Sequence, residues 1–114
     1  MMRVDPNLWQ IPQWHADWDG EFQFAGLRTF AKALHGGTDL DATLSIIEEG
    51  YARLEVFDSA TRTGLVYVNR DDDPLVPLFT VYAGAGDDEL TTTDIAAAVR
   101  FLDQRRTAFP EDAR

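Results

Sequence analysis

Few residues in this chain have types and spacing that fit phosphate chemistry. The glycines within residues 84–86 come closest to a nucleotide-binding loop. A dinucleotide loop needs a small residue three positions further on, where this chain has Glu89, and a Walker loop needs a Gly-Lys-Ser/Thr sequence that the chain lacks. The carboxylates of Asp87, Asp88 and Glu89 would also repel a phosphate. We therefore interpret the segment as a turn and expect no phosphate site there.

A metal site has equally little support in the sequence. The three carboxylates of residues 71–73 are hard oxygen ligands of the kind that Ca²⁺ prefers. An EF-hand loop alternates its ligands and carries glycine at its sixth position and glutamate at its twelfth, and Pro74 and Leu75 break that spacing. The sequence predicts a solvated acidic turn here, and it predicts neither a metal nor a cofactor.

Nucleophiles and general bases are scarce. The chain has no cysteine, which excludes disulfides, thiol catalysis and cysteine-ligated metals. Its two histidines, His15 and His35, form no His-Glu-x-x-His pair. Neither Ser45 nor Ser59 lies in a Gly-x-Ser-x-Gly elbow. We expect a protein without catalytic residues, and a small enzyme that pairs His15 or His35 with a carboxylate is the weaker alternative.

The charge balance is strongly acidic. The chain carries 20 acidic and 10 basic side chains, a net charge of −10, and the whole excess precedes residue 91. This charge argues against nucleic acid and anionic membranes as direct partners, because neutralising phosphates supplies most of a nucleic-acid binder's affinity. It fits plain solubility, and it equally fits a surface that steers a basic protein partner into contact.

The length of 114 residues suits a single domain, residues 1–114, with one hydrophobic core. No apolar run approaches the roughly 20 residues that span a bilayer. The N-terminus lacks the hydrophobic stretch of a signal peptide. We therefore expect a cytoplasmic protein.

The apolar pattern predicts an α+β fold: a four-stranded antiparallel meander with two helices on one face, forming a two-layer sandwich. Segments that alternate or are rich in β-branched residues predict strands at residues 43–47, 52–57, 64–68 and 78–82. We interpret residues 84–90 as a polar loop, residues 1–24 as an irregular, aromatic-rich lead-in that can include a short strand at 21–24, and residues 110–114 as a frayed tail.

Two amphipathic segments predict the helices. Leu27, Phe30, Ala31 and Leu34 recur at helical spacing, which predicts a helix over residues 26–35. The threonines and acid of residues 91–94 have the form of a capping box, which predicts a second helix that begins near Thr92 or Thr93 and ends before Pro110.

This arrangement resembles the Imm1-type immunity proteins of bacterial polymorphic toxin systems, over roughly residues 21–109. The most specific part is the C-terminal helix with its threonine-rich entry at residues 91–94, its Phe101-Leu102 step and its basic pair, Arg105 and Arg106. The chain departs from the family in its middle, because residues 64–68 lack the tryptophan-bearing glycine turn expected in the meander.

The resemblance implies an immunity protein that binds its cognate toxin and occludes the toxin's active site or substrate cleft. Toxins paired with this family are often nucleic-acid-modifying enzymes, deaminases among them, so the implied partner is a basic protein domain. The resemblance implies no catalytic residue. Because interface residues diverge between members, it implies no contact residue either.

The expected contacts come instead from the acidic clusters at turns, which can share one rim of the domain, and from tryptophans of the lead-in as aromatic anchors. The predicted partner-binding residues are Asp71, Asp72, Asp73, Asp87, Asp88, Glu89, Trp14 and Trp18.

Two further hypotheses stay open. One is a secretion-chaperone-like or adaptor domain, an acidic dimer that holds an extended segment on a hydrophobic surface. The other is a ligand-binding domain whose pocket is lined by Trp9, Trp14, Trp18 and Tyr82.

Overall fold

The computed structural model describes residues 6, 9, 18–48, 51–84 and 88–109. Its elements, in chain order, are α1 (Trp18–Gly37), β1 (Asp41–Glu48), β2 (Tyr51–Asp58), β3 (Thr61–Arg70), β4 (Pro77–Ala83), β5 (Asp88–Thr92) and α2 (Ile95–Asp103). The predicted α+β class with an antiparallel sheet and two helices is confirmed, but the sheet has five strands and not the four that were predicted. Within these residues no helix is both long enough and apolar enough to cross a bilayer.

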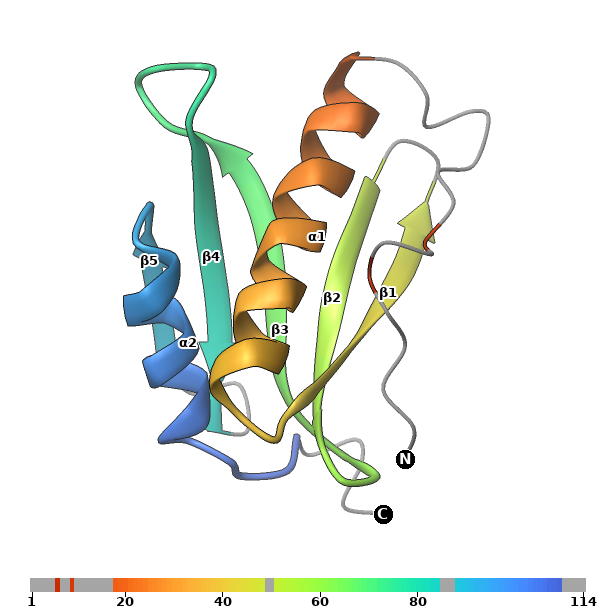
Figure 1. The fold of residues 1–114 in the computed structure, drawn as a ribbon, viewed down its shortest axis with the longest axis vertical. Coiled ribbons are helices and arrows are strands. Elements are labelled where there is room, and N and C mark those ends of the chain that lie inside the picture. The colour runs from red at the N-terminus through yellow and green to blue at the C-terminus, as the bar shows by residue number, and fades with distance from the viewer. Residues whose placement is uncertain (1–5, 7–8, 10–17, 49–50, 85–87, 110–114) are drawn as a thin grey trace.

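The sheet is a simple meander. The strands lie in the order β1-β2-β3-β4-β5, and each neighbouring pair is antiparallel. Figure 1 shows both helices on the same face, where α1 covers β1, β2 and β3 and α2 covers β4 and β5. Neither α1 nor α2, the helices of the described residues, lies on the opposite face, and we call it the open face.

The core lies between the helices and the covered face of the sheet. Phe24, Leu27 and Leu34 of α1 are fully buried, as is Phe30, whose ring centroid lies 5.2 Å from that of Phe79 on β4. Each buried side chain of this size contributes about 1.5–3 kcal/mol relative to an exposed one. Hydrophobic burial on this face therefore fixes how the helices sit on the sheet.

The first helix begins earlier than predicted. Residues 21–24 are helical, so the predicted short strand there is wrong, and the irregular lead-in does not extend to residue 24. The alternation of Phe22 and Phe24 suggested a strand, but Phe24 also lies three residues before Leu27 and extends the helical stripe by one turn. Burial of that ring against the sheet favours the helix.

The fifth strand was missed because its sequence is polar. The predicted loop over residues 84–90 contains the start of β5, an edge strand in which Leu90 pairs with Val81. Exposed acids such as Asp88 and Glu89 are typical of edge strands, which use charge to prevent further strand pairing.

The second helix begins later than predicted because Thr91 and Thr92 belong to β5. Asp94 is the N-cap, and its carboxylate accepts a hydrogen bond of 3.2 Å from the backbone N–H of Ala97. The helix ends at Asp103, well before Pro110. The predicted frayed tail, residues 110–114, lies outside the described residues.

Candidate binding surface

The open face carries a hollow of about 370 Å³ in the middle of the sheet. Its walls come from alternate residues of β2, β3 and β4, whose other residues point into the core, and from the segment after α2. The lining residues are Tyr51, Leu65, Tyr67, Asn69, Thr80, Tyr82 and Phe109. We call this site the tyrosine hollow, because it gathers all three tyrosines of the chain.

The three tyrosine rings contact one another across neighbouring strands. The ring centroids of Tyr51 and Tyr67 are 6.0 Å apart, and those of Tyr67 and Tyr82 are 5.8 Å apart with the rings nearly perpendicular. Edge-to-face pairs of this kind are favourable beyond the area that they bury. The rings are half-buried, so they form a pre-ordered aromatic surface that still faces solvent.

Arg53 fixes the middle ring. Its Nη1 donates a hydrogen bond of 2.8 Å to the hydroxyl oxygen of Tyr67, and its guanidinium carbon lies 5.9 Å from the ring centroid. The Nε–H of Arg53 is buried and has no acceptor among the described residues. A buried donor without an acceptor is unfavourable, so this N–H offsets part of the stability that the bond to Tyr67 supplies.

Tyr82 stays protonated in its surroundings. Burial raises the pKa of its hydroxyl above the ordinary 10.0, and the neighbouring carboxylate of Glu89 raises it further by its charge and by accepting a hydrogen bond. The neutral phenol can therefore donate a hydrogen bond at every physiological pH.

The C-terminal segment closes one end of the tyrosine hollow. The backbone N–H of Phe109 donates to the carbonyl oxygen of Arg62 at 3.1 Å, and the Arg62 guanidinium lies 5.3 Å from the Phe109 ring. Arg62 is itself held by Glu55, at 2.8 Å between Nη1 and Oε2. These contacts anchor an aromatic wall that the sequence alone did not place near the sheet.

The predicted acidic contacts do not form one rim. Asp71, Asp72 and Asp73 lie in the turn between β3 and β4, whereas Asp88 and Glu89 pair with the far end of β4. A seven-residue strand separates the two groups by about 20 Å at roughly 3.3 Å per residue. The structure therefore places the two groups at opposite ends of the sheet, while Asp87 lies outside the described residues.

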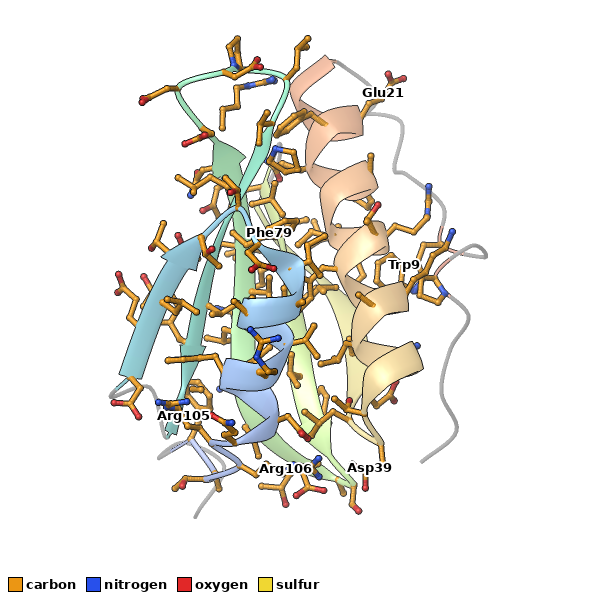
Figure 2. The ribbon with its side chains drawn as sticks, turned by 60° about the vertical axis from the view of Figure 1, so that its left-hand side comes forward. Trp9, Glu21, Asp39, Phe79, Arg105 and Arg106 are labelled. Atoms are coloured by element: carbon orange, nitrogen blue, oxygen red, sulfur yellow. The ribbon has the colours of Figure 1, made fainter. Side chains whose placement is uncertain are left out.

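Many acids at the second of these ends are already paired. Arg106 contacts Asp39 at 2.8 Å, Asp58 at 3.6 Å and also Asp103, and Figure 2 shows Arg106 and Asp39 close together at this end. The Arg106 guanidinium donates hydrogen bonds to the carboxylates of Asp103 and Asp39, and these bonds raise its pKa. Arg105 similarly lies 3.3 Å from Asp88.

The tryptophans do not join Tyr82 in one pocket within the described residues. Trp9 packs against the core, and its carbonyl oxygen accepts a hydrogen bond of 3.1 Å from Arg28 of α1, on the helix side of the sheet. Trp18 begins α1, but its side chain lies outside the described residues, as does Trp14. The predicted pocket of tryptophans and Tyr82 therefore has no support in this part of the chain.

His35, the histidine that lies within the described residues, contacts the start of the first strand. The Nε2 atom of His35 lies 3.1 Å from Asp41 Oδ1 and 3.2 Å from the backbone nitrogen of Ala42, where the end of α1 meets β1. In residues 18–48, 51–84 and 88–109, no three His, Cys, Asp or Glu side chains converge as a metal site. His15 lies outside these residues.

Sequence reasoning missed Tyr51 and Tyr67 as site residues. The usable signal was the alternation in residues 51–57 and 64–68, where both tyrosines occupy positions opposite to the buried aliphatic ones. In a sheet with one covered face, such positions must lie together on the other face.

Comparison of the chain with family models, with curated proteins and with solved structures finds no match in any of the three. The resemblance to Imm1-type immunity proteins therefore stays a prediction.

Proposed function

We propose that this chain is a non-enzymatic immunity protein that binds a cognate bacterial toxin and occludes the toxin's active site or substrate cleft. The observation that carries the proposal is the tyrosine hollow, a pre-ordered aromatic surface on the sheet face that neither α1 nor α2 covers.

The tyrosine hollow suits protein recognition better than it suits a reaction. Tyrosines dominate binding energy at protein interfaces because a large ring and a hydroxyl group are presented with little loss of side-chain entropy. The contacts between the three rings and the hydrogen bond from Arg53 to Tyr67 reduce that entropy loss further. The hydroxyl oxygen of Tyr82, whose proton goes to Glu89, can accept a hydrogen bond from a polar group of a partner.

The acidic charge supports a basic partner. With a net charge of −10, the chain attracts basic proteins at long range and repels nucleic acid. Toxins that bind nucleic acid have basic clefts, and an acidic protein is complementary in charge to such a cleft. The proposed partner is thus a basic, nucleic-acid-modifying toxin domain, a deaminase being one candidate.

A neutralisation assay tests this function. The product of the reading frame next to this chain's gene is expressed in a host cell with and without the protein, and growth is measured. We expect the protein to restore growth and to bind the purified domain, with an association rate that falls steeply as salt concentration rises. Failure to restore growth, or an association rate that does not change with salt concentration, contradicts the proposal.

Variants of the tyrosine hollow test the surface. Tyr51→Ser and Tyr67→Ser should each weaken toxin binding by about 2 kcal/mol, roughly 30-fold, because each removes a central aromatic contact. Thr43→Ala is the matched control, since Thr43 is exposed on the same face in β1, outside the tyrosine hollow. Equal affinities for all three variants would show that binding occurs elsewhere.

One observation favours the chaperone-like alternative as a second candidate. The edge strand β1 exposes Ile46 and Ile47 to solvent by 38% and 45%, and an exposed apolar edge can pair with a second strand. Light scattering separates the two candidates: a stable dimer that Ile47→Lys dissociates favours the chaperone, and a monomer favours the immunity protein.

A further inference from the structure

A second concave surface lies on the helix side of the molecule, between the first turns of α1 and the hairpin of β3 and β4. It encloses about 220 Å³, and mostly apolar atoms line it. Its lining residues are Phe22, Ala25, Gly26, Thr29, Leu75, Pro77 and Phe79. We call it the hairpin groove; the two elements that border it, the first turns of α1 and the green turn that joins β3 to β4, lie near the upper end of Figure 1.

Leu75 is the most unusual residue of the hairpin groove. Its side chain is 73% exposed, the largest exposed fraction of any large apolar side chain in the described residues. Hydrogen bonds order the backbone of the turn around Leu75. The N–H of Leu75 donates to Asp73 Oδ1 at 3.0 Å, and the N–H of Val76 donates to the carbonyl oxygen of Asp73 at 2.9 Å. An ordered turn therefore presents an apolar side chain to solvent at the mouth of an apolar groove.

Gly26 leaves the floor of the hairpin groove open. A Cβ atom at this position would lie 3.1 Å from Cγ1 of Val68 and 3.7 Å from Cβ of Pro77. The glycine therefore lets α1 approach the sheet closely, and it leaves no side chain of its own to fill the space above Pro77 and Phe79.

The charges around the hairpin groove are acidic. Asp71, Asp72 and Asp73 are all exposed and lie in the same turn as Leu75. The nearby guanidinium of Arg70 already makes two contacts within the chain. It lies 4.2 Å from the centroid of the Phe22 ring, and its Nη1 donates to the carbonyl oxygen of Pro74 at 2.8 Å. An apolar side chain that enters here would thus meet carboxylates at the rim.

We propose that the hairpin groove is a docking site for an apolar side chain flanked by lysine or arginine on a protein partner. Its size argues for a side chain and against a free metabolite, because pockets for small molecules hold roughly 300–1,000 Å³. The rim carboxylates select basic neighbours by charge complementarity. The site lies on the helix side, away from the tyrosine hollow, and the proposal does not depend on the toxin being the partner.

A peptide titration followed by amide NMR shifts tests the proposal on the full chain. The probe is a blocked Lys-Lys-Leu-Lys-Lys peptide, and the two comparison peptides replace the leucine with serine or all four lysines with glutamates. We expect the first peptide to shift the amides of Gly26, Thr29 and Leu75 with an affinity in the millimolar range, and the other two to leave them unchanged.

Variants separate the apolar part of the site from the charged part. Ala25→Trp should fill the hairpin groove and abolish the response, whereas Ala33→Trp, exposed on the same helix outside the groove, should preserve it. Replacing Asp71, Asp72 and Asp73 together with asparagine should weaken peptide binding about tenfold at low salt. Asparagine at position 73 keeps an oxygen for the Leu75 N–H, so the turn is retained.

Three results would overturn the proposal. One is equal shifts with all three peptides, and another is a response that survives Ala25→Trp. The third is a shift of the groove amides when the protein alone is diluted, since the occupant would then be a second copy of the chain. None of these results bears on the toxin proposal, which is tested by growth and by variants of the tyrosine hollow. Either proposal can therefore be contradicted while the other stands.

Discussion

The two faces of this sheet are built from the same strands and have opposite chemistry. On the covered face, Leu54, Val66 and Val81 are fully buried beneath the helices. On the open face, the alternate positions hold tyrosines, Arg53 and Thr80, which are half-buried and joined by ring contacts and hydrogen bonds. The covered face is closed by the helices of the chain itself, whereas the tyrosine hollow on the open face stays partly exposed to solvent.

This difference has an energetic consequence. Substitutions on the covered face should change the free energy of unfolding, because they leave cavities or force atoms together. Substitutions in the tyrosine hollow should change stability little and binding strongly. The following variants test that contrast from its strongest effect to its weakest.

Phe79→Ala should have the largest effect on stability. The Phe79 side chain is fully buried in β4 against Phe30, so its removal leaves a cavity between sheet and helix. We expect a loss of about 3–5 kcal/mol in the free energy of unfolding, measured by urea denaturation. A loss below about 1 kcal/mol would mean that the covered face is loosely packed, and the contrast between the faces would fail.

Gly64→Ala should destabilise the protein by steric overlap. The added Cβ would lie 2.5 Å from Cδ2 of Leu102 on α2 and 3.3 Å from the carbonyl oxygen of Tyr82. We expect a loss of about 1–3 kcal/mol by the same measurement. Gly36→Ala is the control, because its Cβ meets nothing within 4 Å in the last turn of α1, and it should stabilise the helix by about 0.5–1 kcal/mol.

Tyr67→Phe should have a smaller effect, because it removes one hydroxyl group from the tyrosine hollow. The Arg53 Nη1 donor loses its acceptor at 2.8 Å, and we expect a loss of about 1 kcal/mol. A double-mutant cycle with Arg53→Met isolates the pair. If the two effects add without coupling, the hydrogen bond does not order the Tyr67 ring.

The titration of Tyr82 should be the weakest effect on stability. Its pKa is raised above the ordinary 10.0, so between pH 10 and the folded-state pKa the unfolded tyrosine is ionised while the folded one is not. Stability should therefore be intact below pH 10 and fall as the pH rises through this window. Ultraviolet absorbance of the phenolate should show one late titration step that Tyr82→Phe removes; its persistence would assign the raised pKa to another tyrosine.

Local periodicity predicted much of the fold. The stripe of Leu27, Phe30, Ala31 and Leu34 predicted α1, and alternation predicted four of the strands. It failed at β5, where Leu90 is the one apolar side chain among charged and threonine neighbours, and at Phe22 and Phe24, whose spacing fits a strand and a helix alike. In both places contacts with distant residues decide the structure.

The candidate site was less predictable than the fold. Charge singled out residues 71–73 and 87–89, but the length of β4 separates residues 71–73 from Asp88 and Glu89, and Arg105 contacts Asp88. The tyrosine hollow depends on the pairing of three strands and on the return of Phe109, which only long-range contacts can specify.

The sequence by itself determined the acidic charge, the absence of cysteine chemistry and the two-layer α+β class, because composition and periodicity act locally along the chain. The tertiary structure decided which face of the sheet the helices cover, and hence that Tyr51, Tyr67 and Tyr82 meet on the other. It also placed Leu75 beside the hairpin groove. Those outcomes depend on strand register and burial, which bring together residues that are distant in the chain.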